Sequence, residues 1–554
     1  FDIENISYED QKVFDLLSSG NTVGLFQVES AGMREALIQM KPNHIEDIIA
    51  LVALYRPGPM SNIPTYNDCK HGRQTPDYLH PLLEDILKPT YGVIIYQEQV
   101  MQIAQKLSGF TAGQADLLRR AMGKKKRAEL EKQKQGFIAG ALKNGIAKDV
   151  AAGIFLKIEP FAEYGFNKSH AAAYAIISYQ TAFLKTYYPK EFIAASMTMD
   201  ISNQNKLSEF YEELKRLNIE ITRPDINECF ADFRTIDGKF YYALGGIKAV
   251  GFEAISNVVK ERTENGKFQS INDFLNRVNP KDINKLQLEG LVKAGAFDNI
   301  DNNRQALFNS IPNFILKTKN IYENKAANQI DLFGSDEEQD NEIVLNIEDW
   351  KFEDRLSREF EAIGFFISNH PLNQFKEIFD DYKIVDYSKF NLDDNIKDAN
   401  IAATLLKITE RKTAKGNSYG VIKFTDLTSV FELFIFSDIL ELNREVLVEG
   451  SSLIITLIKT ISKDESKSKR INVQKIASLK DLFNKPVNEI VFNIKSIKDI
   501  DKISDLVDEE GTTEVTININ DENNDISFKL KNRRLIDRKA INILRNNDIS
   551  TIIH

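Results

Sequence analysis

The sequence predicts a multidomain α+β protein. A chain of 554 residues is too long for one hydrophobic core, so we expect several domains. Residues 1–212 carry apolar side chains at helical spacing, whereas residues 398–480 hold short strand-length runs separated by turn signals. Between them, residues 213–316 contain glycine-bearing segments typical of helix-hairpin-helix units. We expect a helical region, a tandem helix-hairpin-helix domain, an OB-type β-barrel, and a small C-terminal α/β domain at 486–554.

The composition excludes several classes of protein. The net charge is −10, with 42% hydrophobic and 27% charged residues, which is typical of globular proteins. The two cysteines, Cys69 and Cys229, lie in no paired motif, and the six histidines show no ligand spacing, so no metal site is expected. No apolar run approaches the length of a membrane span. We therefore expect a cytoplasmic protein with no membrane partner.

A basic island stands out in the helical region. Between Asp116 and Gln135 there are eight basic and three acidic residues, a local net charge of +5 in an acidic chain. Such self-repulsion favours an anionic ligand, and phosphates are the commonest. Arg119 and Arg120 follow an apolar run, where two guanidinium groups can converge on one polyphosphate. The alternative is a solvated basic helix face.

A second candidate block runs from Tyr164 to Tyr174. Tyr164 and Phe166 flank a glycine, and Asn167, Lys168, Ser169 and His170 then lead into an alanine-rich helix. That order suits a helix N-terminus, whose N–H groups admit an anion or a sugar. The alternative is an ordinary capped helix with a surface histidine.

The region 213–316 contains the clearest hairpin. A strand-like run from Phe240 is followed by Gly246-Ile247-Lys248-Ala249-Val250-Gly251, whose glycines would let backbone N–H groups reach a phosphate. Residues 288–297 resemble a second, less complete copy. The alternative is two αα-hairpins that use glycine C-caps. DNA binding here would be independent of sequence.

A polar linker, 317–345, contains Gln329-Ile330-Asp331-Leu332-Phe333-Gly334. Exposed apolar side chains in such a segment are typical of short peptide ligands. A connecting region, 346–397, separates this linker from the strand-rich segment.

The segment 398–480 fits an OB-type barrel with basic loops. Tyr419 and Phe424 are available for stacking, a combination that suits single-stranded DNA. The alternative is a barrel with solvated lysine loops. The loop cations are Lys412, Lys415, Lys459, Lys463, Lys467, Lys469 and Arg470.

Together these segments resemble the alpha subunit of bacterial DNA polymerase III, the C-family replicative polymerase. Residues 24–30, 53–59 and 91–101 are similar to its successive fingers blocks, residues 118–126 and 164–170 to its nucleotide-binding blocks, and residues 329–333 to its sliding-clamp peptide. The resemblance covers nearly all of the chain.

The resemblance implies that residues 1–212 are the fingers and that Arg119 and Arg120 grip the β and γ phosphates of the incoming nucleotide. His170 would lie near the sugar and exclude a 2′-hydroxyl. The implied dNTP-binding residues are Arg119, Arg120, Lys124, Lys125, Tyr164, Asn167, Ser169 and His170. The implied DNA-binding residues are Gly246, Lys248, Gly251, Lys293, Lys412, Lys415, Lys467 and Arg470. The implied clamp-binding residues are Gln329, Asp331, Leu332 and Phe333.

Polymerases of this family hold two Mg²⁺ ions with three palm aspartates, which would precede Phe1. We therefore expect this chain to be a piece of a longer protein. It would contain no catalytic or metal-binding residue and would be inactive alone. Asp380-Asp381, Asp393-Asp394 and Asp499-x-Asp501 are interpreted as turn and cap carboxylates.

The implied partners are primer–template DNA, a dNTP, the beta sliding clamp and, through residues 486–554, the clamp-loader tau subunit. A proofreading exonuclease subunit would bind through the part that precedes Phe1. An alternative is a DNA-binding clamp adaptor without catalysis, which leaves the blocks around Arg119 and His170 unexplained. A repair enzyme built on helix-hairpin-helix units lacks an identifiable nucleophile or base.

Overall fold

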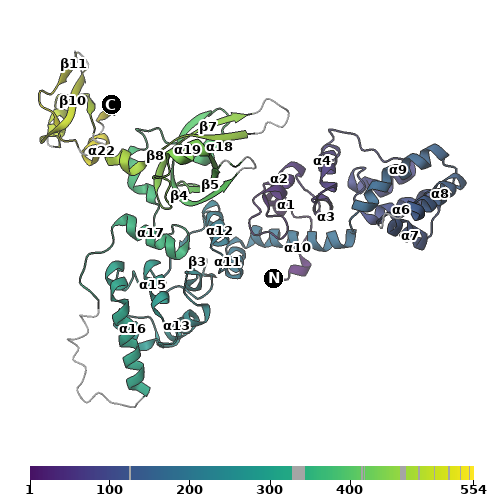
Figure 1. Ribbon diagram of the computed structural model, residues 1–554, viewed down its shortest axis with the longest axis horizontal. Coiled ribbons are helices and arrows are strands. Elements are labelled where there is room, and N and C mark those ends of the chain that lie inside the picture. Colours follow the sequence, from purple (N-terminus) through teal and green to yellow (C-terminus); the bar gives the residue numbers. More distant parts are fainter. Residues whose placement is uncertain are drawn as a thin grey trace. The chain divides into compact units, whose positions relative to one another are not determined.

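The computed structural model describes residues 1–123, 127–326, 344–412, 416, 418–461, 469–484, 487–504, 506–521, 524–536, 538–547 and 549–553 (Figure 1). The chain divides into two compact units. Unit 1 is Phe1–Thr222 with Glu228–Gly246, and unit 2 is Arg223–Asn227 with Ile247–His554.

The first core of unit 1 forms where α10 packs along α3 (Figure 1). Phe14, Leu51 and Tyr179 are among its fully or almost fully buried side chains. The Tyr179 hydroxyl accepts a hydrogen bond from the Asp10 N–H at 3.0 Å, which ties α10 to the start of α1. The helices of this core are α1 (Gln11–Ser18), α2 (Ala31–Met40), α3 (Ile45–Leu54), α4 (Ile63–Lys70) and α10 (Lys168–Tyr187).

The second core of unit 1 is a helical bundle that carries the basic island. Leu118, Phe137 and Phe155 are completely buried in it. The prediction of helices in this region is confirmed. These segments form helices because their apolar residues recur on the face that each helix turns toward the core. The bundle consists of α5 (Glu84–Leu87), α6 (Gln97–Ser108), α7 (Ala112–Gly123), α8 (Arg127–Lys143) and α9 (Lys148–Tyr164).

Unit 1 ends in two helices and a small sheet. A buried ion pair, Lys185 Nζ to Glu213 Oε1 at 2.6 Å, joins α10 to α12. The sheet has the order β1-β3-β2. These elements are α11 (Pro189–Met199), α12 (Gln204–Arg216), β1 (Ile221–Thr222), β2 (Arg234–Ile236) and β3 (Lys239–Tyr241).

Unit 2 begins with the predicted hairpin and a set of helices. Gly290 on α15 lies against the hairpin so closely that a Cβ there would sit 2.7 Å from the Lys248 carbonyl oxygen. Helix α16 continues ten residues into the predicted linker, where Thr318 is buried against the preceding turn and donates to the Phe314 carbonyl. The helices are α13 (Phe252–Asn265), α14 (Ile271–Arg277), α15 (Lys285–Lys293), α16 (Arg304–Ala326) and α17 (Phe352–Ile363).

A five-stranded antiparallel sheet with the order β6-β5-β4-β7-β8 forms the next core. Its inner face includes Ile401, Ile422 and Ile455, all completely buried. In the described residues no ladder joins β6 to β8, so the structure shows a sheet rather than a closed barrel. The elements are α18 (Tyr387–Leu392), β4 (Asp398–Lys412), β5 (Ser418–Thr425), β6 (Val430–Phe436), α19 (Ser437–Leu442), β7 (Ser452–Ile461), β8 (Lys469–Ser478) and α20 (Leu479–Asn484).

The C-terminal part is a four-stranded mixed sheet with the order β11-β10-β9-β12. Strands β9 and β10 are parallel, and the other neighbours are antiparallel. Within the described part of the chain, no helix combines the length and apolar character that crossing a membrane requires. The elements are β9 (Glu489–Ile494), α21 (Asp499–Ser504), β10 (Glu510–Asp521), β11 (Asn524–Lys529), α22 (Arg538–Asn546) and β12 (Ser550–Ile553).

Candidate functional site

The two predicted arginines lie on α7 and share one carboxylate. Asp116 Oδ1 accepts hydrogen bonds from Arg119 Nε at 3.0 Å and Nη2 at 2.6 Å, and Asp116 Oδ2 lies 2.7 Å from Arg120 Nε. The Arg119 side chain is 29% exposed and that of Arg120 is 62% exposed. The two guanidinium groups therefore share one carboxylate, and that of Arg120 is the more exposed to solvent.

The second block begins α10 as predicted. Asn167 is the N-cap, and its Oδ1 accepts a hydrogen bond from the His170 N–H at 2.8 Å. Glu98 on α6 accepts a hydrogen bond from the Lys168 N–H at 3.0 Å and another from Asn167 Nδ2 at 3.0 Å. A carboxylate of the chain itself thus occupies the anion position at this helix N-terminus.

The two blocks meet at Gln97. The Gln97 N–H donates to the Phe166 carbonyl at 3.0 Å, and the Phe166 N–H donates to the Ile95 carbonyl at the same distance. The Gln97 side chain accepts from Arg119 Nη1 at 3.3 Å. Gln97 therefore connects Arg119 to the turn that leads into α10.

Aromatic side chains line the start of α10. The His170 ring lies beside those of Phe166 and Tyr174 in tilted arrangements, with ring centroids 5.4 Å and 4.6 Å away. The Arg56 guanidinium lies over the Phe166 ring, 4.6 Å from its centroid. Burial lowers the pKa of Arg56 from its ordinary value. The start of α10 therefore combines aromatic rings with a cation, Arg56, and this combination suits a planar ligand.

Sequence reasoning missed four residues that shape this site: Arg56, Gln97, Glu98 and Asp116. Each lies in or beside a block that the sequence analysis singled out. The available signal for Asp116 was its spacing, three and four residues before the two arginines on a predicted helix. Gln97 and Glu98 gave no comparable signal, since their partners are 22 to 70 residues away in sequence.

Several predicted site residues lie outside the described residues, or have no described side chain. The first group comprises Lys124, Lys125, Gln329, Asp331, Leu332, Phe333, Lys415 and Lys467. For Tyr164 the backbone ends α9, and the side chain is not described. Ser169 is exposed near the start of α10. These assignments stay predictions.

The first hairpin has an open tip in unit 2. Lys248, Ala249 and Gly251 are exposed, and Gly251 is the N-cap of α13 without a side-chain cap. The Lys248 N–H is engaged, because it donates to the Ala362 carbonyl at 2.9 Å. Gly246 lies at the end of unit 1, where its N–H donates to the Ala243 carbonyl at 2.9 Å. The start of α13 remains a candidate phosphate contact.

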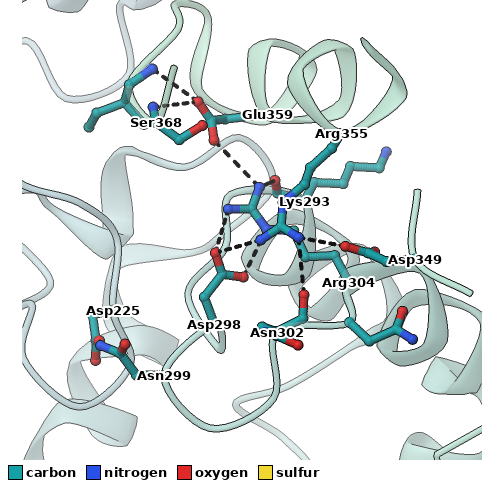
Figure 2. Close-up of polar contacts among 12 residues, drawn as sticks. Asp225, Lys293, Asp298, Asn299, Asn302, Arg304, Asp349, Arg355, Glu359 and Ser368 are labelled. Atoms are coloured by element: carbon teal, nitrogen blue, oxygen red, sulfur yellow. Dashed lines mark hydrogen bonds and ion pairs between the residues drawn. The ribbon is translucent and has the colours of Figure 1, made fainter. Parts of the chain in front are cut away.

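The second copy of the hairpin is packed differently. A Cβ on Gly295 would lie 2.0 Å from Arg304 Nη2, so the guanidinium covers this glycine. Figure 2 shows Arg304 turned toward Asp298, and Glu359 above it; the distances are 2.7 Å from Nη2 to Asp298 and 3.4 Å from Nη1 to Glu359. The position that a phosphate would approach is therefore filled by an internal ion network.

Lys293 is also engaged in unit 2. Its ammonium group lies 3.0 Å from Glu361 Oε1, and its side chain is 13% exposed. Its carbonyl accepts a hydrogen bond from Arg304 Nη1 at 3.0 Å. Lys293 would have to leave Glu361 before it could contact DNA.

The strand-rich region corrects two details of the loop prediction. Lys459 is not a loop cation: its side chain is completely buried, and its ammonium donates to the carbonyls of Phe390 and Asp393 at 2.5 and 2.7 Å. Phe424 is completely buried in the sheet core, because its position in β5 points inward, and is not available for stacking. Lys412 and Arg470 are exposed, as predicted.

The outer face of the sheet carries a different aromatic group. Tyr419 pairs with Phe436 across β5 and β6, and Phe434 lies beside them. The exposed fractions of Phe434 and Phe436 are 55% and 50%. Arg411 is the neighbour of Tyr419 on β4. This face combines stacking surface with a cation.

The later carboxylates have structural partners. Asp381 binds Arg538 and Arg545 of α22 at 3.0 and 2.8 Å, and Asp394 lies 2.7 Å from Lys469. Among the described residues no three His, Cys, Asp or Glu side chains gather as a metal site requires.

Comparison with known proteins gives the family. The model of the bacterial DNA polymerase III alpha subunit finger domain matches residues 1–145, and that of the helix-hairpin-helix motif matches residues 218–307. The chain is 42% identical over 456 residues to DNA polymerase III subunit alpha of Caulobacter vibrioides, with 82% of this chain and 40% of that protein covered. It is 37% identical over 546 residues to the subunit of Borreliella burgdorferi, with 96% and 47% covered. The chain belongs to the bacterial DNA polymerase III alpha-subunit family.

The matched region is only part of each relative. The chain spans 40% to 47% of the length of these alpha subunits, and a further one, from Rickettsia bellii, is 40% identical with 93% of this chain and 47% of that protein covered. The finger-domain match contains Arg56, Gln97, Asp116 and both arginines. The helix-hairpin-helix match contains Lys248, Gly251 and Lys293.

Proposed function

We propose that this chain is the nucleotide-, DNA- and clamp-binding part of a replicative DNA-directed DNA polymerase that acts in the bacterial cytoplasm. One observation carries the nucleotide part: Arg119 contacts Gln97, whose backbone pairs with Phe166 at the start of α10. This contact supports the assignment of the arginine pair and the aromatic turn to one site in unit 1. A DNA-binding adaptor would have no need for such a site.

The proposed reaction is attack of a primer 3′-hydroxyl on the α-phosphate of a deoxynucleoside triphosphate, with pyrophosphate leaving. Arg119 and Arg120 would bind the β and γ phosphates and neutralise the charge that develops on the leaving group. Arg120 is suited to this, because its side chain is 62% exposed. Lys124 and Lys125 follow α7 in sequence and would extend the positive field toward the triphosphate or the template backbone.

The turn at Phe166 would bind the sugar and the base. His170 contacts two aromatic rings and would exclude a ribose 2′-hydroxyl by its bulk. Tyr164, Asn167 and Ser169 complete the proposed set. Asn167 acts through the start of α10, since its side chain caps that helix.

Magnesium, which the family implies, finds no fitting ligand set in the described residues, because no three suitable side chains converge there. No step is therefore assigned to a metal on this chain. The proposed role of these residues is to bind and orient the triphosphate and to stabilise the leaving group.

Replacement of Arg120 tests the nucleotide site. In a polymerase that contains this chain, Arg120→Ala should lower single-turnover incorporation about a hundredfold, as loss of one transition-state donor does. The matched control is Arg73→Ala, an exposed arginine of unit 1 that pairs with Asp68, which should leave the rate unchanged. A wild-type rate in Arg120→Ala would refute the assignment and favour the adaptor.

We propose that DNA contacts the first hairpin and the outer face of the five-stranded sheet, which we assign to an OB-type, partly open barrel. Support comes from the exposed start of α13 and from Tyr419, Phe434 and Arg411. Phe434→Ala should weaken binding of single-stranded oligonucleotides by about tenfold, which is one stacked base. The control is Leu442→Ala, an 85% exposed residue on α19.

We propose that residues 329–333 bind the sliding clamp, that residues 486–554 bind the clamp-loader tau subunit, and that an exonuclease joins the same assembly. The clamp assignment rests on sequence and resemblance. Replacement of Leu332 and Phe333 by alanine should abolish clamp-dependent processivity and leave short-primer extension intact. Retention of the double variant by clamp in a pull-down would contradict it.

A further inference from the structure

The side chains of two consecutive helical residues do not converge by themselves. Arg119 and Arg120 are successive residues of α7, so their Cα–Cβ directions differ by about 100° around the helix axis. Asp116 stands three and four residues earlier, on the face between them. Long side chains on a helix lean toward its N-terminus, which brings both guanidinium groups back toward that carboxylate.

The contacts show how one carboxylate serves both arginines. Oδ1 takes two N–H groups of Arg119, at 3.0 and 2.6 Å, and Oδ2 lies 2.7 Å from Arg120 Nε. A phosphate group offers the same arrangement of acceptor oxygens to a pair of guanidinium groups. Asp116 thus contacts both arginines through the groups that a phosphate would use.

We propose that Asp116 is an internal counter-anion of the nucleotide site, which holds Arg119 and Arg120 together until the triphosphate displaces it and which takes them back when pyrophosphate leaves. This inference rests on the proposed function, because it requires that the arginine pair binds the triphosphate. Asp116 is in these terms a positioning residue rather than a catalytic one.

Exposure and charge make the exchange possible. The Asp116 side chain is 29% exposed and that of Arg120 is 62% exposed, so solvent screens the contact and an incoming anion can reach it. A polyphosphate carries several negative charges and the carboxylate one, so the cations favour the polyphosphate. The arginine contacts hold the pKa of Asp116 below its ordinary value, chiefly through the hydrogen bond from Arg119, so they favour the charged carboxylate.

The test is the binding of inorganic tripolyphosphate to this chain, followed by ³¹P NMR titration. Asp116→Asn should bind tripolyphosphate about fivefold more tightly than the wild type, since one repelling charge close to the anion is removed under partial screening. The matched control is Asp149→Asn, which changes the net charge equally at an exposed position in the first turn of α9. A purely structural role for Asp116 would weaken binding instead.

The outcomes separate the inference from the proposed function. Tighter binding in Asp116→Asn but not in Asp149→Asn supports the inference. Unchanged or weaker binding in Asp116→Asn, or an equal gain in both variants, overturns it. If a variant with Arg119→Ala and Arg120→Ala binds like the wild type, the arginine site itself is wrong and both ideas fail.

A second readout uses a polymerase that contains this chain. Asp116→Asn should lower the inhibition constant for pyrophosphate about fivefold, because the product no longer competes with the carboxylate. Asp116→Glu, which keeps the charge, should restore the wild-type value. An inhibition constant that is equal in all three proteins would contradict the exchange.

Discussion

Two arginine–carboxylate clusters in this chain use the same chemistry in opposite surroundings. In unit 1, Asp116 joins Arg119 and Arg120 at the surface, and the Arg120 side chain is 62% exposed. In unit 2, Arg304 joins Asp298 and Glu359, and the Arg304 and Glu359 side chains are 4% and 0% exposed (Figure 2). The first cluster can exchange its anion for a ligand, whereas the second is closed to ligands and joins segments of the fold.

The number of fixed partners reinforces that difference. Glu359 also accepts hydrogen bonds from the N–H groups of Ile367 and Ser368, at 3.0 and 2.9 Å. Figure 2 shows the Ser368 contact above Arg304, and Arg355 also donates to Asp298, at 3.0 Å. The network therefore joins the start of α16 to α17. The proposed clamp peptide lies between these two helices in sequence.

The largest expected effect comes from opening the buried cluster. Arg304→Ala leaves the Glu359 carboxylate buried without its cation, so it should lower the free energy of unfolding by about 3–5 kcal/mol. The measurement is urea denaturation of the whole chain, followed by circular dichroism. Lys319→Ala is the control on the same helix, an exposed pair with Glu323 whose loss should cost less than about 0.5 kcal/mol. Equal costs would remove the distinction between the clusters.

A smaller effect should come from crowding the same cluster. Gly295 has a φ of +79°, and a Cβ there would meet Arg304 Nη2. Gly295→Ala should cost about 2–3 kcal/mol, as backbone strain adds to displacement of the guanidinium. Gly145→Ala, at a φ of +81° with open space around it, measures the strain alone and should cost about 1 kcal/mol. If both cost the same, the ion network tolerates the displacement.

The exposed cluster should contribute little to stability. Arg120→Ala should change the free energy of unfolding by less than about 0.5 kcal/mol, although it should lower nucleotide incorporation about a hundredfold. The same denaturation experiment measures the first quantity. A loss of several kcal/mol would mean that the pair is structural and would undermine its assignment as a ligand site.

The smallest effect concerns pH. The pKa of Asp116 is lowered, first by the hydrogen bond from Arg119 and then by the charges of both arginines. A lowered pKa in the folded chain means that the stabilisation is complete above the ordinary aspartate value and is lost as pH falls through the lowered pKa. Carbon NMR titration of Asp116 should show this, and Arg119→Ala should raise the pKa toward the ordinary value. An unchanged titration would show that the contact is absent in solution.

Much of the local structure could be predicted from sequence. Apolar spacing indicated the helices of residues 1–212, and Asn167 was found where a helix N-terminus was expected. Strand-length runs separated by turn signals indicated the strand-rich segment 398–480, which holds β4 to β8. Family membership also follows from ordered sequence blocks. These features depend on neighbours within a few residues, which sequence displays directly.

Lys459 and Gly295 show what local patterns miss. Lys459 was predicted to be a loop cation, but it lies inside and binds carbonyls of Phe390 and Asp393, 66 to 69 residues away. Gly295 lies in the segment that resembled a second, less complete hairpin, and Arg304 covers it. Each outcome depends on which distant segment packs against the residue, and no periodicity reports that.

The charge of the basic island, the helices that carry it and the family can all be read from the order of residues. Which arginines face solvent depends on the folded chain, because burial arises from contacts between segments far apart in sequence. The same is true of Gln97, which joins Arg119 to the start of α10 through a backbone pairing with Phe166. Chemical type is a property of a residue, whereas availability to a ligand is a property of its surroundings.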